Sequence, residues 1–226
     1  MKLVREHIHT VFVRGDPNTV RFEETFSLTE EIEDRLVYVG YVSPPPPASW
    51  PERRNRIVVS QGGGEIGKTL LRAAIKTAPL LPDYHFLVVT SSRAAVAEIA
   101  ELQALVSSPN VQVVSFLNDF QENLQSAALS ISLGGDNTLM DVISTRTPAL
   151  AYPYAGNSEQ GLRIEKLAGK RFVLPLMETD LAPERLSTKI RETINQTYPS
   201  QAITISGAAE ISRRISAILE GGLCED

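Results

Sequence analysis

The chain has 226 residues, of which 42% are hydrophobic and 22% are charged, and its formal net charge is −5. This length suits one sizeable α/β domain or two small ones, and the negative charge offers no basic surface for nucleic acid. The only cysteine, Cys224, excludes a disulfide within one chain, and no apolar run approaches the roughly 20 residues of a membrane-spanning helix. We therefore expect a cytoplasmic protein without nucleic-acid partners.

Residues 1–42 form a segment that is too short to bury a core of its own. It contains a predicted strand, HTVFVRG, a polar helical stretch, TEEIEDRL, and a short apolar run, VYVGYV. His7 and His9 alternate on the predicted strand, but a metal site would need at least a third ligand. Residues 43–55 begin with SPPPPASWP, and we interpret them as a linker because consecutive prolines favour an extended path.

From residue 56 onward, strands and helices alternate regularly, so we interpret residues 56–226 as one domain. Each predicted strand is followed by helical spacing or capping signals, which predicts a Rossmann-like α/β fold with a parallel sheet and helices on both faces. Ligands of such sheets bind beyond the carboxyl ends of the strands. The predicted strands are Arg56–Ser60, His85–Thr90, Val111–Phe116, Leu129–Leu133, Ala149–Pro153 and Arg171–Leu174.

The stretch SQGGGEIGKT, at the end of the first of these strands, fits three phosphate-binding patterns, of which GGG alone is a looser glycine loop. Its last two residues, Lys68 and Thr69, complete G-x-x-x-x-G-K-[ST], and Gly62, Gly64 and Gly67 fit G-x-G-x-x-G. A P-loop also needs an Asp that ends another strand and binds Mg²⁺, and a dinucleotide site needs an acidic residue about 20 positions further on. Neither stands in its expected place, so these two interpretations are weakened. Lys68 is then either a solvated helix lysine, which we favour, or a diphosphate contact.

A second glycine pair, in LGGDNTLMDV, favours a different ligand. Gly134 and Gly135 follow a predicted strand, so their amides would face a ligand at the positive end of a helix that begins near Asn137. Thr138 and Asp141 are spaced i, i+3 on one face of that helix, where they could donate to a phosphate and accept from ribose hydroxyls. Two glycine loops could hold a diphosphate from two sides. The alternatives are tight turns, helix capping and a solvated charge at Asp141.

Three segments in this order resemble the C-terminal, donor-binding domain of GT-B glycosyltransferases, in particular of glycosyltransferase family 28: SQGGGEIG, LGGDNTLMDVISTRTPALAYPY and AGNSEQGLRIEKLAGK. The resemblance covers roughly residues 56–222. It implies binding of a nucleoside-diphosphate sugar, such as the UDP-sugar UDP-GlcNAc, for inverting glycosyl transfer. The sequence contains no Asp-x-Asp metal motif, so we expect a metal-independent reaction without a cofactor.

The resemblance also implies which residues bind the donor. Phe116 and Leu117 would lie at the nucleotide base, and Asp141 would bind the ribose in place of the family's usual Glu. The sugar hydroxyls would be recognised by Glu159 and Gln160. The last of these also fits a capping box that begins at Asn157. The residues implied at the diphosphate are Gly62, Gly63, Gly64, Gly134, Gly135 and Thr138. We also expect Asn137, at the start of the same helix, to bind the donor.

Residues 1–42 would then resemble the end of an N-terminal acceptor domain. The general base of such enzymes lies in that domain, so we assign no catalytic residue to this chain. We expect an acceptor domain or subunit as partner, through which the protein could associate peripherally with a membrane. The alternatives are a noncatalytic nucleotide-sugar-binding subunit, a P-loop ATPase and a UDP-sugar epimerase of the same fold.

Overall fold

The computed structural model describes residues 1–47, 49–61, 67–154, 156–200 and 203–220. The chain divides into two compact units: Met1–Pro45 together with Gln201–Asp226, and Pro46–Ser200. The first boundary between the units lies inside the proline-rich segment. None of the helices in the described ranges has the length and apolar character that crossing a membrane requires.

The first unit combines the N-terminal segment with the last helix of the described chain. Its elements are α1 (Lys2–His7), β1 (Val11–Val13), β2 (Leu36–Tyr38), α8 (Gly207–Leu219) and three short 3₁₀ turns, η1 (Phe22–Glu24), η2 (Thr29–Glu31) and η3 (Glu33–Arg35). β1 and β2 pair in parallel. The stretch TEEIEDRL therefore forms two 3₁₀ turns and the start of β2 instead of the expected helix.

Backbone hydrogen bonds explain why residues 203–220 group with the first unit. The Tyr41 amide donates to the Thr204 carbonyl (2.8 Å), and the Gly207 amide donates to the Tyr41 carbonyl (2.9 Å). The predicted domain of residues 56–226 thus extends past the end of the second unit. Contacts between segments so far apart in sequence leave no local pattern from which the boundary could be read.

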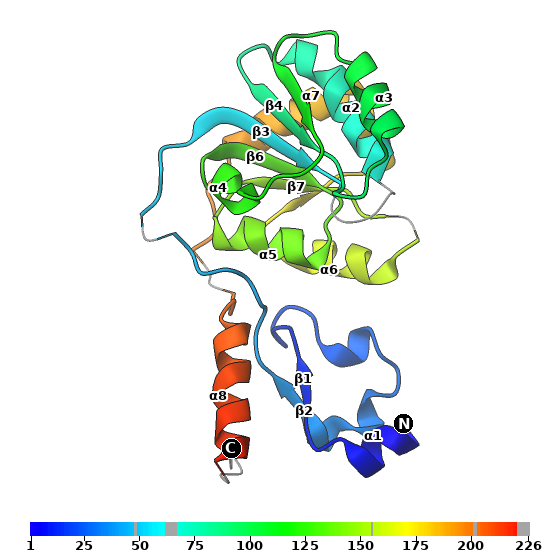
Figure 1. Cartoon of the computed structure of the whole chain (residues 1–226), viewed down its shortest axis with the longest axis vertical. Coiled ribbons are helices and arrows are strands. Elements are labelled where there is room, and N and C mark those ends of the chain that lie inside the picture. The colour runs from blue at the N-terminus through cyan, green and yellow to red at the C-terminus, as the bar shows by residue number, and fades with distance from the viewer. Residues whose placement is uncertain (48, 62–66, 155, 201–202, 221–226) are drawn as a thin grey trace. The chain divides into compact units, whose positions relative to one another are not determined.

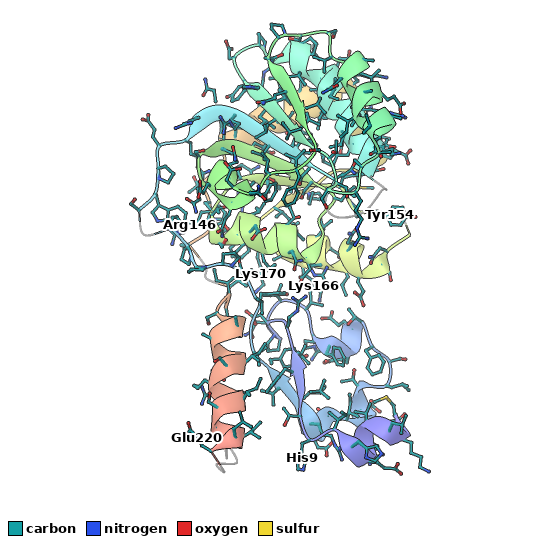
Figure 2. All side chains as sticks on the ribbon, viewed as in Figure 1. His9, Arg146, Tyr154, Lys166, Lys170 and Glu220 are labelled. Atoms are coloured by element: carbon teal, nitrogen blue, oxygen red, sulfur yellow. The ribbon has the colours of Figure 1, made fainter. Side chains whose placement is uncertain are left out.

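The predicted strand HTVFVRG is present as β1, but the placement of His7 and His9 on it is wrong. His7 is the last residue of α1, and the strand begins only at Val11. His9 lies on the exposed connection between the two elements (Figure 2). The two histidines therefore do not alternate along a strand.

The second unit is a parallel six-stranded sheet with helices on both faces, as the sequence predicts. Its strands are β3 (Arg54–Ser60), β4 (His85–Val89), β5 (Val111–Val114), β6 (Ala127–Ser132), β7 (Ala149–Ala151) and β8 (Leu174–Pro175), in the order β5-β4-β3-β6-β7-β8. All six predicted strands are present, with ends that differ by a few residues. The chain moves outward from β3 to β5 and then returns to β6 beside β3.

Helices cover the two faces of this sheet, with α2, α3 and α7 on one side and α4, α5 and α6 on the other (Figure 1). The main apolar core includes Ile57 and Val59 of β3, Leu70 of α2 and Leu186 of α7, all of them buried. Burial of each such side chain contributes about 1.5–3 kcal/mol. The helices are α2 (Lys68–Thr77), α3 (Val96–Ala104), α4 (Phe120–Gln125), α5 (Asp136–Ser144), α6 (Ser158–Gly169) and α7 (Pro183–Ile194), with 3₁₀ turns η5 (Ala78–Leu80) and η6 (Glu178–Leu181).

Candidate functional site

The two glycine segments leave adjacent strands at the point where the strand order reverses. Ser60 of β3 and Ser132 of β6 are direct neighbours in the sheet. The first segment follows Gln61, and its predicted site residues Gly62, Gly63 and Gly64 lie outside the described residues. The second, Gly134 and Gly135, opens α5. In open parallel sheets this reversal point is where ligands bind.

The second glycine segment has a backbone that requires glycine. Gly134 has φ +72°, and a Cβ at this position would lie 2.5 Å from Cδ1 of Ile164, which is buried on α6. The Gly134 amide donates to the Ser132 hydroxyl at 3.4 Å. At Gly135, the N-cap of α5, a Cβ would meet no described atom within 4 Å. The segment is therefore closely packed at Gly134 and open at Gly135.

Helix α5 is amphipathic in the way the sequence predicts. Leu139, Met140, Val142 and Ile143 are buried, whereas Thr138 and Asp141 are half-buried on another face. Burial raises the pKa of Asp141 from its usual value to about 6. Asp141 is therefore not a freely solvated helix charge. Asn137, in the first turn, is exposed.

The raised pKa of Asp141 predicts a pH dependence of stability. The folded protein binds the proton of the Asp141 carboxyl more tightly than the unfolded chain does, so protonation of this carboxyl stabilises the fold. This stabilisation is fully present below about pH 4 and is lost as the pH rises through about 6. We expect the free energy of unfolding of Asp141→Asn to depend less on pH in this window, as measured by urea denaturation at several pH values. If the free energy of unfolding changed equally with pH in the variant and the wild type, the burial of this carboxyl would be contradicted.

The start of α6 is fixed by the residues that the sequence identifies as a cap. Asn157 Oδ1 accepts a hydrogen bond from the Gln160 amide at 3.0 Å, which confirms the cap. The side-chain Oε1 of Gln160 accepts from the Tyr154 amide at 3.1 Å, so it stabilises the preceding loop rather than completing a capping box. Glu159, in the same first turn, is exposed.

An ion pair that the sequence analysis did not anticipate joins α6 to α5. The Nε atom of Arg163 lies 3.3 Å from Oδ1 of Asp136, and the two side chains are only 19% and 25% exposed. Asp136 is the first residue of α5. The sequence carried no signal for this pair, because its two members belong to different helices.

Lys68, the first residue of α2, is also held by an ion pair. Its Nζ atom lies 3.1 Å from Oε2 of Glu98, a carboxylate that is 8% exposed on α3. The Lys68 side chain is 40% exposed, so it is partly solvated as predicted, but it is paired rather than free. Gln61 is buried beside this helix start, and its side-chain amide has no partner within the part of the chain that the structure describes. Glu98 was missed because it belongs to no recognisable motif, and Gln61 was missed because only the residues from Gly62 onward fit the phosphate-binding patterns of SQGGGEIGKT.

Phe116 and Leu117 follow β5, the strand at one edge of the sheet, at the same carboxyl end as the two glycine segments. Phe116 is 56% exposed, and Leu117 is half-buried. This pair is separated from β3 by β4, so it lies on one side of the reversal point, with Gly134, Gly135 and Asp141 on the other.

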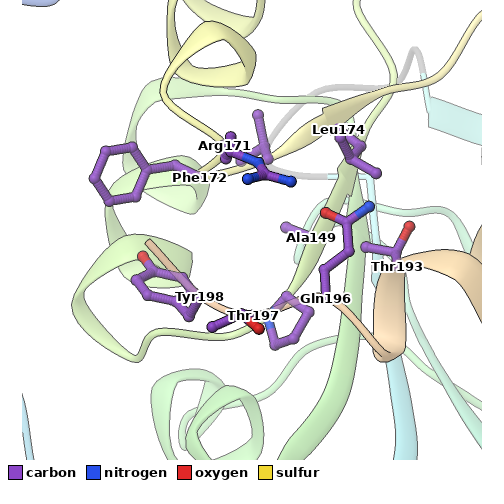
Figure 3. Close-up of a pocket in the computed structure, with 10 residues that line it drawn as sticks. Ala149, Arg171, Phe172, Leu174, Thr193, Gln196, Thr197 and Tyr198 are labelled. Atoms are coloured by element: carbon purple, nitrogen blue, oxygen red, sulfur yellow. The ribbon is translucent and has the colours of Figure 1, made fainter. Parts of the chain in front are cut away.

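A hollow at the opposite end of the sheet is a poor candidate for this site (Figure 3). It lies where β7 and β8 begin, whereas the glycine segments follow strand ends. Its aromatic residues are engaged in packing: the rings of Phe172 and Tyr198 are 5.8 Å apart, and the Tyr198 hydroxyl donates to the Ile143 carbonyl at 3.2 Å. The lining residues are Pro148, Ala149, Arg171, Phe172, Val173, Leu174, Thr193, Gln196, Thr197 and Tyr198.

Comparison with known proteins identifies the family. The family model of the glycosyltransferase family 28 C-terminal domain matches residues 57–215. The chain belongs to this family. The resemblance of the three sequence segments is thus confirmed, and the parallel sheet with flanking helices is the Rossmann-like fold of a GT-B C-terminal domain.

Individual glycosyltransferases are similar to the chain at low identity. An uncharacterized glycosyltransferase of Methanopyrus kandleri is 22% identical over 96% of the chain and 64% of its own length. The UDP-N-acetylglucosamine–N-acetylmuramyl-(pentapeptide) pyrophosphoryl-undecaprenol N-acetylglucosamine transferase of Thermosipho africanus is 25% identical over 64% of the chain and 41% of its own length. The crystal structure of Acinetobacter baumannii MurG superposes with a TM-score of 0.62 at 17% identity, covering 93% of the chain and 64% of that protein. The chain therefore spans less than two thirds of each relative.

Proposed function

We propose that the second unit binds the donor, a nucleoside-diphosphate sugar, in glycosyl transfer. The observation that carries this proposal is that Ser60 and Ser132, which end the neighbouring strands β3 and β6, lie side by side at the reversal point, and that the chain after each of them carries a glycine segment before the next helix. Helix N-termini carry unpaired N–H groups and partial positive charge, which suit a diphosphate. Asp141 lies on the second of these helices, where its carboxylate would accept hydrogen bonds from ribose hydroxyls.

A UDP-sugar such as UDP-GlcNAc is the donor that we propose, since the named relative from Thermosipho africanus uses UDP-N-acetylglucosamine. In the inverting reaction an acceptor oxygen bonds to the sugar C1 from one side, while the bond from C1 to the diphosphate oxygen breaks on the other. Negative charge then accumulates on the leaving diphosphate. The amides at Gly135 and the N-termini of α2 and α5 would stabilise this charge without a metal ion.

The acceptor and the general base belong to another domain or subunit in this proposal. The chain spans less than two thirds of its relatives, so a complete enzyme of their size would contain a further domain. A base in that domain would receive the proton of the acceptor hydroxyl. Transfer activity is therefore expected from the chain together with that partner rather than from the chain alone.

Thermal unfolding in the presence of candidate ligands tests the donor assignment. We expect UDP, UDP-GlcNAc and UDP-glucose to raise Tm in the presence of EDTA, because a ligand that binds only the folded state stabilises it. GDP and NAD serve as comparison ligands and should raise Tm less. A rise in Tm with Mg-ATP alone would overturn the proposal in favour of a P-loop site. A rise with UDP that needs added Mg²⁺ would contradict metal independence.

A further inference from the structure

The first turn of α5 contains a charge that opposes the proposed ligand. Asp136 is the first residue of this helix, and its carboxylate interacts favourably with the positive helix end. The proposed function places a diphosphate at the same helix end. A carboxylate at this position would repel that diphosphate unless a positive charge offsets it.

Arg163 supplies a positive charge beside the Asp136 carboxylate. Its Nε atom is 3.3 Å from Oδ1 of Asp136, and its side chain is 19% exposed, so water screens this pair less than it would a surface pair. The next residue, Ile164, is buried against Gly134, as the 2.5 Å approach to a Cβ there shows. Arg163 is therefore anchored beside the second glycine segment by the packing of its own helix.

The guanidinium has more donors than this contact uses. Arginine carries five N–H donors, and the contact with Asp136 is made by Nε, which carries one of them. Its Nη atoms are suited to phosphate oxygens, since a guanidinium binds phosphate more specifically than an ammonium does. Gly135 leaves open space in the same segment, where a Cβ would meet no described atom within 4 Å.

We propose that Arg163 is a donor-binding residue that offsets the charge of Asp136 and thereby makes the N-terminus of α5 a site for the donor diphosphate. This inference rests on the proposed function. It assigns opposite effects to the two members of the ion pair: Arg163 favours binding of the diphosphate, and Asp136 opposes it. If the pair only held α5 and α6 together, the loss of either member would weaken the site in the same way.

Calorimetric titration of uridine, UMP and UDP into four variants tests this inference. We expect Arg163→Met to weaken UDP binding by about tenfold, to weaken UMP binding less and to leave uridine within about twofold, because the attraction grows with ligand charge. Asp136→Asn should bind UDP at least as tightly as the wild type. The double variant should recover most of the lost affinity. Lys76→Met, the control, removes a positive charge from the exposed, distant end of α2 and should leave the affinity for all three ligands unchanged.

Two results would overturn the inference while leaving the proposed function intact. One is an equal loss of affinity for all three ligands in Arg163→Met, and the other is a weakened UDP affinity in Asp136→Asn. If Arg163→Met does not fold, Asp136→Asn and the double variant still decide the sign of the effect. A wild-type protein that binds none of the three ligands would instead refute the proposed function, and the inference would be rejected with it.

Discussion

Replacement of Asp141 by Ala is expected to weaken UDP binding by about a hundredfold while leaving the fold intact. In the proposed complex the Asp141 carboxylate accepts hydrogen bonds from ribose hydroxyls, and a hydrogen bond to a charged group contributes about 1.5–3 kcal/mol. The loss of two such bonds corresponds to roughly two factors of ten in affinity. Burial raises the pKa of this carboxyl because it removes the charged form from water, which is unfavourable. Replacement by Ala takes away this unfavourable desolvation rather than a stabilising contact, so the variant should fold.

Ligands that lack a ribose hydroxyl separate this contact from a general loss of the site. The wild type should bind UDP more tightly than 2′-deoxy-UDP, whereas Asp141→Ala should bind the two with similar affinity in calorimetric titrations. Glu192→Ala, which removes an exposed carboxylate on α7, is the control and should behave as the wild type. An unchanged preference for UDP in Asp141→Ala would show that this residue does not bind the ribose.

The parts of the fold that repeat a local pattern could be predicted from the sequence. The strands of the second unit, such as Ile57–Val59 within β3, consist of apolar residues buried on both faces of the sheet. In the same way, the spacing of Leu139, Met140, Val142 and Ile143 identifies the buried face of α5. Gly134 could be found because a sharp turn between a strand and a helix selects glycine.

The parts that depend on contacts distant in sequence could not be predicted. Lys68 looks like a surface lysine because its partner, Glu98, comes from a different helix that packs beside α2 only in the folded chain. The pairing of Arg163 with Asp136 is hidden for the same reason. The grouping of segment 203–220 with the first unit could not be predicted, because it depends on backbone hydrogen bonds to Tyr41 that side-chain patterns do not reveal.

The packing of Gly134 predicts the largest loss of stability among the site variants. Gly134→Ala must adopt φ near +72° with a side chain, which costs about 1–3 kcal/mol, and its Cβ would approach Ile164 to 2.5 Å. Because Ile164 is buried, it has little room to move, and overpacking of this kind adds about 1–3 kcal/mol. We expect urea denaturation to show a total loss of about 2–6 kcal/mol in the free energy of unfolding.

The neighbouring glycine provides a matched control that separates stability from binding. Gly135 has φ −61°, an ordinary value for any residue, and a Cβ there would meet no described atom within 4 Å. Gly135→Ala should therefore change the free energy of unfolding by less than about 1 kcal/mol. If the open space beside it receives the donor diphosphate, the same variant should bind UDP more weakly than the wild type. Equal losses of stability in the two variants would contradict the geometry of this segment, and an unchanged UDP affinity in Gly135→Ala would place the diphosphate elsewhere.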